Sequence, residues 1–304
     1  MPATPVNAFR SGFACLAGRP NVGKSTLTNA LVGAKVAITS SRPQTTRRVI
    51  RGIVHRPDAQ LVIVDTPGLH RPRTLLRERL DSLVRGTLTE VDVIGFCVPA
   101  GENIGPGDKY LANELAALKG TPVVAIVTKT DEVPQDRIAS QLMAISELGE
   151  WADVVPVSAV AGFQLDVLRD VLISHLPEGP ALYPDGELTD EPEQIMVAEL
   201  IREAALEGVR DELPHSIAVL VEEMGPRPGQ PDLIDVYAEL YVERPSQKAI
   251  VIGTRGARLK EVGTRARQQI EALLGSRIYL DLHVRIAKDW QRNPKYLRRL
   301  GFYD

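Results

Sequence analysis

The sequence has little cysteine and no long apolar run. Its 304 residues include two cysteines, Cys15 and Cys97, which exclude a disulfide framework and a cysteine-rich zinc site. Both lie in apolar, strand-like runs, so we interpret them as unreactive core thiols. The longest apolar runs fall far short of the ~18 residues that a membrane span needs. The apolar run near the N-terminus is also too short for a signal peptide. We therefore expect a cytoplasmic protein with no integral membrane segment.

Charge is nearly balanced over the whole chain but is unevenly placed. The formal net charge is −3. Residues 246–304 contain 13 Lys and Arg against 5 Asp and Glu, a net of +8, so residues 1–245 carry −11. A basic C-terminal segment on an acidic body predicts a local surface for nucleic acid or anionic lipid.

The pattern of apolar residues predicts two domains joined by a linker. Residues 1–176 alternate short apolar runs with helical patterns, which is typical of a mainly parallel sheet with helices on both faces. Residues 177–192 are rich in proline, glycine and acid and lack periodicity, so we place the linker there. Residues 193–304 predict the order α-β-β-α-α-β, followed by a basic helix.

A glycine-rich segment between a predicted strand and a predicted helix indicates a phosphate site. It reads GRPNVGKS and fits the pattern G-x-x-x-x-G-K-[ST]. The glycines let successive N–H groups point at an anion, and the helix N-terminus adds partial positive charge. Lys24 would reach the β- and γ-phosphates, and the Ser25 hydroxyl would bind Mg²⁺. The alternative is a chance turn. The candidates are Gly18, Arg19, Pro20, Asn21, Val22, Gly23, Lys24, Ser25 and Thr26.

Two further polar segments can complete this site. Asp65-Thr66-Pro67-Gly68 closes an apolar run and is followed by Leu69. The Asp65 carboxylate can hold Mg²⁺ through water, and the Gly68 N–H can turn onto a γ-phosphate. A threonine of the Thr45-Thr46 doublet can also join the Mg²⁺ shell; we take Thr46 as the candidate, and the sequence leaves the choice open. The alternatives are an ordinary turn and a polar loop.

The segment Thr128-Lys129-Thr130-Asp131 follows another predicted strand and suits a guanine base. Asp131 can accept hydrogen bonds from the N1–H and exocyclic amine of guanine, a donor pair that adenine lacks. The Lys129 stem can pack over the purine face. Ser158-Ala159 can offer a backbone N–H to the guanine carbonyl. The alternative for both segments is a polar loop.

In the basic segment, Gly253-Thr254-Arg255-Gly256 joins two helical patterns. Two glycines permit a tight turn that a phosphodiester backbone can approach closely. The surrounding cations are Lys248, Arg255, Arg258 and Lys260. The alternative is an ordinary helix–helix turn. The tail over residues 290–303 mixes aromatics with arginines, and it can either stack on RNA or cap its domain.

In this order, the segments resemble the G motifs of the translation-factor-type small GTPases. The phosphate loop, the threonine doublet, the Asp65–Gly68 segment and the second-domain pattern narrow the resemblance to the Era family. Residues 251–260, VIGTRGARLK, are similar to that family's V-I-G-x-[KR]-G segment. The implied fold is an α/β P-loop GTPase domain followed by an α+β type II KH domain.

The resemblance also implies an activity and partners. It implies that the chain binds GTP and GDP with Mg²⁺ and hydrolyses GTP, with Lys24, Thr46 and Gly68 as catalytic residues. It further implies binding to the 3′ end of 16S ribosomal RNA, a role in assembly of the 30S subunit, and peripheral association with the inner face of the cell membrane.

Individual positions in these motifs modify these expectations. Thr128 stands where the family's guanine motif usually begins with Asn, so we expect weaker nucleotide binding with guanine preference retained. Leu69 stands where Ras-like GTPases have a water-orienting glutamine, so we expect slow intrinsic hydrolysis. Arg47 follows the threonine doublet, and Arg71 and Arg73 follow the Asp65–Gly68 segment. The sequence assigns none of the three as an arginine finger. Asn21 is similar to a residue that holds K⁺ in some related GTPases; a simple turn role is equally open.

Two other classes of function compete with this interpretation. One is a non-enzymatic RNA-binding adaptor that only holds nucleotide. The other is a GTPase that uses its basic tail on an anionic membrane surface.

Overall fold

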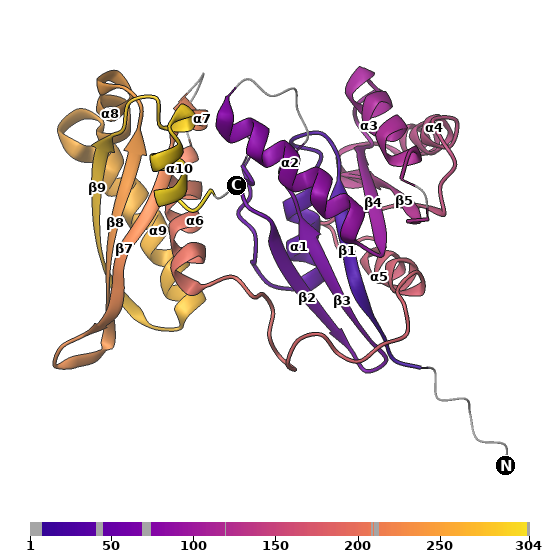
Figure 1. Cartoon of the computed structure of the whole chain (residues 1–304), viewed down its shortest axis with the longest axis horizontal. Helices are drawn as coiled ribbons and strands as arrows, with labels where there is room; N and C mark the ends of the chain where they lie inside the picture. The colour runs from indigo at the N-terminus through magenta and orange to yellow at the C-terminus, as the bar shows by residue number, and fades with distance from the viewer. Residues whose placement is uncertain are drawn as a thin grey trace, which may run out of the picture. The chain divides into compact units, whose positions relative to one another are not determined.

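Short apolar runs that alternate with amphipathic helical patterns build the first part of the chain (Figure 1). The computed structural model describes residues 8–40, 45–68, 74–118, 120–207, 209 and 213–302. Contacts divide the chain into two compact units. Unit 1 comprises Met1–Ala37, Thr46–Arg71 and Leu80–Asp190, and unit 2 comprises Ile38–Thr45, Pro72–Arg79 and Glu191–Asp304.

Unit 1 is built on a six-stranded sheet of order β2-β3-β1-β4-β5-β6. All neighbouring strands are parallel except β2 and β3, which pair antiparallel at one edge. The strands are β1 (Arg10–Ala17), β2 (Ile50–Arg56), β3 (Ala59–Asp65), β4 (Val93–Pro99), β5 (Val123–Thr128) and β6 (Asp153–Pro156). Its helices are α1 (Lys24–Val32), α3 (Pro106–Ala116), α4 (Gln135–Ser146), α5 (Leu165–Ser174) and, from Leu80 onward, α2 (Leu75–Glu90).

Strand β1 is buried on both faces, and this places helices on both sides of the sheet. Ala14 and Leu16 join a core that includes side chains of α1 and α5. Cys15 and Ala17 point the other way, into a core that includes side chains of α2, α3 and α4. Burial raises the pKa of the Cys15 thiol to about 12, in keeping with an unreactive core thiol.

The register of the parallel strands brings their carboxyl ends to one edge of the sheet. Leu16 near the end of β1 pairs with Asp65 at the end of β3, and Pro99 of β4 pairs with Thr128 of β5. Ligands of open α/β sheets bind at this edge, in the loops that follow the strands. The phosphate loop, the Asp65–Gly68 segment and the Thr128–Asp131 segment follow strands at this edge, and Thr46 precedes β2, which begins there.

The segment predicted as a linker lies largely on unit 1 instead. The N–H of Ile53 in β2 donates to the carbonyl of Leu188 at 2.9 Å. The buried Gln60 side chain accepts from the N–H of Tyr183 and donates to its carbonyl, both at 2.9 Å. The division between the units therefore falls after Asp190. A chain without periodicity can still follow a sheet when its backbone groups find partners.

Unit 2 packs α6 (Glu193–Leu206) and α9 (Ala257–Leu274) on one face of a three-stranded sheet (Figure 1). Strand β8 is antiparallel to β7 and parallel to β9. The elements are α6 (Glu193–Leu206), α7 (Leu213–Ser216), β7 (Ala218–Arg227), β8 (Gln230–Val242), α8 (Pro245–Ile252), α9 (Ala257–Leu274), β9 (Arg277–Ile286) and α10 (Pro294–Arg299). Short 3-10 turns cover Thr130–Glu132, Thr254–Gly256 and Trp290–Arg292. Among the described residues, the observed order adds the one-turn helix α7 and two 3-10 turns to the predicted one.

The C-terminal tail packs on unit 2. Trp290 is fully buried, stacks on Phe302 and donates from Nε1 to the carbonyl of Ser216 at 2.9 Å. Leu297 is also fully buried. These residues cap the unit, which is one of the two roles that the sequence left open. Within the described part of the chain, no helix has both the length and the apolar character needed to cross a membrane.

Candidate functional site

The loop between β1 and α1 is curled by left-handed backbone and by close packing. Asn21 and Gly23 have positive φ angles of 63° and 97°. A Cβ on Gly18 would lie 2.8 Å from the carbonyl oxygen of Cys97, so only glycine fits there. The sequence thus folds into a curled loop of the kind that binds anions.

Lys24 begins α1 and folds back over this loop. Its Nζ donates to the carbonyl of Gly18 at 3.0 Å and to that of Arg19 at 3.1 Å. The side chain is only 7% exposed, and burial lowers the pKa of its ammonium group. A desolvated cation held at the loop can interact strongly with a phosphate.

Three oxygen-bearing side chains converge beside the start of α1. Ser25 Oγ donates to Asp65 Oδ2 at 2.6 Å and lies 2.9 Å from Thr46 Oγ1. Thr46 Oγ1 also donates to Asp65 Oδ2 at 3.3 Å. Thr45, in contrast, belongs to unit 2 by its contacts. Within unit 1 the structure therefore brings Thr46, the residue that we took as candidate, to Ser25 and Asp65.

The chemistry of this trio fits a hard cation. Asp65 is fully buried, and burial raises the pKa of its carboxyl group. Its Oδ1 is buried and has no hydrogen-bond partner among the described residues. An orphaned carboxylate oxygen next to two hydroxyls is an oxygen donor set of the kind that Mg²⁺ takes, either directly or through water.

The segment after β3 approaches the phosphate loop. Thr66 Oγ1 donates to the carbonyl of Leu16 at 3.3 Å, which holds the segment on β1. A Cβ on Gly68 would lie 3.0 Å from the backbone nitrogen of Pro20. The Gly68 backbone therefore lies next to the loop, as its candidate role requires. Leu69, Arg71 and Arg73 lie outside the described residues.

The predicted base-binding residues lie together after β5 and β6. Ser158 Oγ donates to Asp131 Oδ1 at 2.5 Å and accepts from the N–H of Ala161 at 2.9 Å. The Thr130 N–H donates to the carbonyl of Val157 at 3.3 Å, which joins the two loops. Lys129 has a positive φ of 58°.

Thr128 connects this base site to the phosphate loop. Its Oγ1 donates to the carbonyl of Val22 at 2.6 Å, and both residues are buried. The bond spans 106 positions of the sequence. The hydroxyl thus joins the end of β5 to the curled loop.

One contact of the loop was not predicted. The Arg19 guanidinium donates from Nε to Asp108 Oδ1 at 2.7 Å and from another nitrogen to Glu102 Oε2 at 2.9 Å. Asp108 is fully buried and also accepts from the N–H of Gly105 at 2.9 Å. The Gly105-Pro106-Gly107-Asp108 sequence is a signal for a capped helix start, but nothing in it names Arg19 as a partner.

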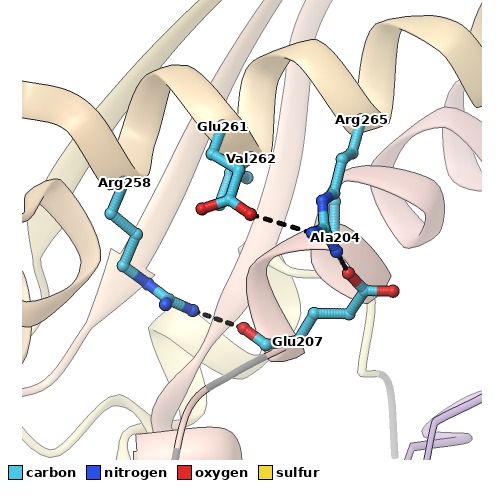
Figure 2. A pocket seen from close by; sticks show the side chains of 6 residues that line it. All are labelled: Ala204, Glu207, Arg258, Glu261, Val262 and Arg265. Carbon is cyan, nitrogen blue, oxygen red and sulfur yellow. Dashed lines mark hydrogen bonds and ion pairs between the residues drawn. The ribbon is translucent and has the colours of Figure 1, made fainter.

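The candidate RNA turn in unit 2 is strongly curved. Gly253, Arg255 and Gly256 have positive φ angles of 72°, 52° and 79°. Thr254, Arg255 and Lys260 are exposed, and Lys248 is half-buried. Arg258 differs from these cations, because its guanidinium reaches the end of α6 (Figure 2).

Comparisons with known proteins match both units. A family model described as a 50S ribosome-binding GTPase matches residues 13–129, and a KH-domain model matches residues 212–291. The GTPase Era of Streptomyces coelicolor is 67% identical over an alignment of 309 positions. The alignment covers 99% of this chain and 97% of that protein. The GTPase Era of Mycobacterium avium is 68% identical over 296 residues, covering 97% and 99%.

This chain belongs to the GTPase Era family.

Solved structures of Era agree in fold. A variant of Aquifex aeolicus Era bound to GDP·AlF4⁻ matches with a TM-score of 0.94 and 36% identity, covering 97% of this chain and all of that one. Era in complex with MgGDPNP and nucleotides 1506–1542 of 16S ribosomal RNA matches with a TM-score of 0.93 and 37% identity, with the same coverage. The predicted fold, a P-loop GTPase domain followed by a KH domain, is confirmed.

The convergence of Thr46 with Ser25 and Asp65 generates a first prediction. Thr46→Val keeps the side-chain shape and removes the hydroxyl, so we expect Mg²⁺-dependent GTP hydrolysis to fall at least about tenfold, because a hydrogen bond to a charged group is lost. Thr45→Val is the matched control and should change the rate little. Steady-state phosphate release over a Mg²⁺ titration measures both. A larger loss of hydrolysis rate in Thr45→Val than in Thr46→Val would show that Thr45, and not Thr46, is the cation ligand.

The bond between Thr128 and Val22 generates a second prediction. Thr128→Val removes the buried donor, so we expect GDP and GTP to bind more weakly by about 1–2 kcal/mol. Thr128→Ser keeps the hydroxyl and should bind as the wild type does. The preference for guanine over adenine should persist in both variants, because Asp131 is untouched. Calorimetric titration measures the affinities, and wild-type affinity in Thr128→Val would contradict the role.

Proposed function

We propose that this chain is a GTP-binding and GTP-hydrolysing switch that binds the 3′ end of 16S ribosomal RNA and assists 30S subunit assembly. The observation that carries the proposal is the meeting of Lys24, the Ser25–Thr46–Asp65 trio and Asp131 at one sheet edge, in a member of the Era family. A related Era binds both MgGDPNP and nucleotides 1506–1542 of 16S ribosomal RNA.

The geometry of unit 1 supports the nucleotide roles that we propose. The curled loop and Lys24 bind the phosphates, and Asp131 reads the guanine edge. Ser25, Thr46 and Asp65 would hold Mg²⁺, Asp65 through water. When bound, the ion neutralises developing charge on the phosphates and orients them.

Hydrolysis rests on positioning and electrostatics in this chain. The Gly68 N–H and Lys24 would contact the phosphates and stabilise charge that builds up there. The residue after Gly68 is Leu69, which cannot donate or accept a hydrogen bond to orient an attacking water. Slow intrinsic turnover follows, which suits a switch better than a metabolic enzyme.

The RNA role rests on unit 2. The turn from Gly253 to Gly256 presents the exposed Thr254 and Arg255 between two helices, and Lys260 is exposed nearby on α9. Residues 246–304 carry a net charge of +8, which favours a polyanion. Peripheral contact with the inner membrane face stays a prediction that co-sedimentation with anionic liposomes can test.

A base-switch experiment tests the proposed function. Asp131→Asn replaces an acceptor by a group that also donates, so we expect loss of GTP hydrolysis and gain of xanthosine triphosphate hydrolysis. A gain of the second activity shows that turnover belongs to this chain and not to a contaminant. In parallel, filter binding of a 16S rRNA 3′-end oligonucleotide with GDPNP and with GDP tests the RNA role. Wild-type protein without hydrolysis and without RNA binding would overturn the proposal.

We also propose that Asn21 holds K⁺ beside the phosphates. Its position in the curled loop supports the role, although the positive φ of 63° is also what a turn-forming Asn adopts. We expect faster hydrolysis in KCl than in NaCl, and we expect Asn21→Ala to remove the difference. Equal rates of the wild type in the two salts would leave Asn21 as a turn residue.

A further inference from the structure

The turn between α8 and α9 holds backbone conformations that need support. Three of its four residues, Gly253, Arg255 and Gly256, have positive φ angles. Arg255 is not glycine, and a left-handed conformation is unfavourable for such a residue. The bond from the Gly256 N–H to the Gly253 carbonyl, at 3.2 Å, closes the turn. Such a turn persists only when neighbouring groups fix it.

Arg258 is the neighbour that packs on this turn. A Cβ on Gly253 would lie 2.7 Å from the Cβ of Arg258 and 3.1 Å from its backbone nitrogen. Gly253 is therefore glycine both for its positive φ and for this close approach. The stem of Arg258 forms one wall of the turn, and a shift of Arg258 would move the turn.

The head of Arg258 is directed at the end of α6 (Figure 2). One guanidinium nitrogen donates to the carbonyl of Glu207 at 2.5 Å and, more weakly, to that of Ala205 at 3.4 Å. The last carbonyls of a helix lack partners within it and attract cations. The Nε of Arg258 is buried and has no hydrogen-bond partner among the described residues. The guanidinium is thus partly desolvated within unit 2.

A second arginine secures the same end of α6. Arg265, two turns along α9 from Arg258, forms ion pairs with the carboxylates of Glu207 and Glu261 (Figure 2). Glu207 is therefore held by its carbonyl from Arg258 and by its carboxylate from Arg265. The pocket between the two helices is lined by these four residues with Ala204 and Val262.

We infer that Arg258 is a positioning residue, which holds the Gly253–Gly256 turn against the end of α6, and not a contact to an RNA phosphate. The inference rests on the proposed RNA function. It reassigns one of the four cations that the sequence grouped together and leaves Arg255 and Lys260, which are exposed, to meet phosphates.

The salt dependence of RNA affinity, measured in a matched pair of variants, distinguishes a phosphate contact from a positioning residue. Arg255→Met and Arg258→Met each remove one positive charge and keep a comparable stem. Loss of one phosphate contact lowers the slope of log affinity against log salt by ~0.7 for single-stranded nucleic acid. We expect that change in Arg255→Met. In Arg258→Met we expect about tenfold weaker binding, from the lost charged hydrogen bond, with an unchanged slope.

Hydrogen exchange of the full-length protein without RNA gives an independent readout. The Gly256 amide should exchange faster in Arg258→Met and should be unchanged in Arg255→Met. Arg258→Lys keeps the charge and loses the guanidinium. We expect it to retain the wild-type salt slope and to show faster Gly256 exchange, and it serves as the test if Arg258→Met does not fold.

The outcomes distinguish this inference from the proposed function. If wild-type protein does not bind the oligonucleotide, the RNA role fails, and the exchange data still test the positioning role. A slope in Arg258→Met that falls as in Arg255→Met would overturn the inference. Unchanged affinity together with unchanged exchange in Arg258→Met would also overturn it.

Discussion

Burial of two opposite charges at one sheet edge constrains the rest of unit 1. Lys24 and Asp65 both lie out of water, and burial lowers the pKa of the lysine and raises that of the aspartate. Such groups are costly to bury unless hydrogen bonds and countercharges compensate. Loop carbonyls serve the lysine, and two hydroxyls serve one oxygen of the aspartate, while the other oxygen stays unpartnered. A bound phosphate and a divalent cation, as proposed for this site, would supply the charges that complete this arrangement.

In both units, a candidate ligand-binding turn with left-handed residues is stabilised by hydrogen bonds that involve side chains. The phosphate loop is fixed by Thr128 on the Val22 carbonyl and by Asp108 on Arg19. The turn in unit 2 is fixed by Arg258 on the end of α6. In each case the supporting contact joins the turn to a distant part of the same unit. Sites for anions depend on such preorganisation, because a loop that had to reorder on binding would lose affinity.

The sequence was informative where local pattern and motif agree. Periodicity predicted the order α-β-β-α-α-β and a following basic helix for residues 193–304, and the structure has these elements in that order. The phosphate, cation and base segments meet because parallel strands end at one edge, which a βα alternation already implies. The order of the motifs along the chain predicted membership of the Era family, and the comparisons confirm it.

The remaining features depend on contacts between distant positions. Arg19 and Asp108 are 89 residues apart, and no local signal pairs them. Residues 177–192 were predicted to be a linker because they lack periodicity. Their hydrogen-bond partners on unit 1, such as Gln60, are distant in the sequence, so a local pattern does not indicate them. Arg258 was grouped with its neighbouring cations because the sequence gives the charge of a side chain. The sequence does not give the direction in which a guanidinium points.

The most direct test of the account is the unfolding transition of unit 1 in the full-length protein with different nucleotides. A ligand that binds only the folded state at about 100 times its dissociation constant stabilises by about 2.7 kcal/mol. If phosphate and Mg²⁺ complete the buried charges and Asp131 reads the base, GDP with Mg²⁺ should raise the melting temperature strongly. GDP with EDTA should raise it less, and ADP with Mg²⁺ should leave it unchanged. Equal shifts with all three would contradict the account.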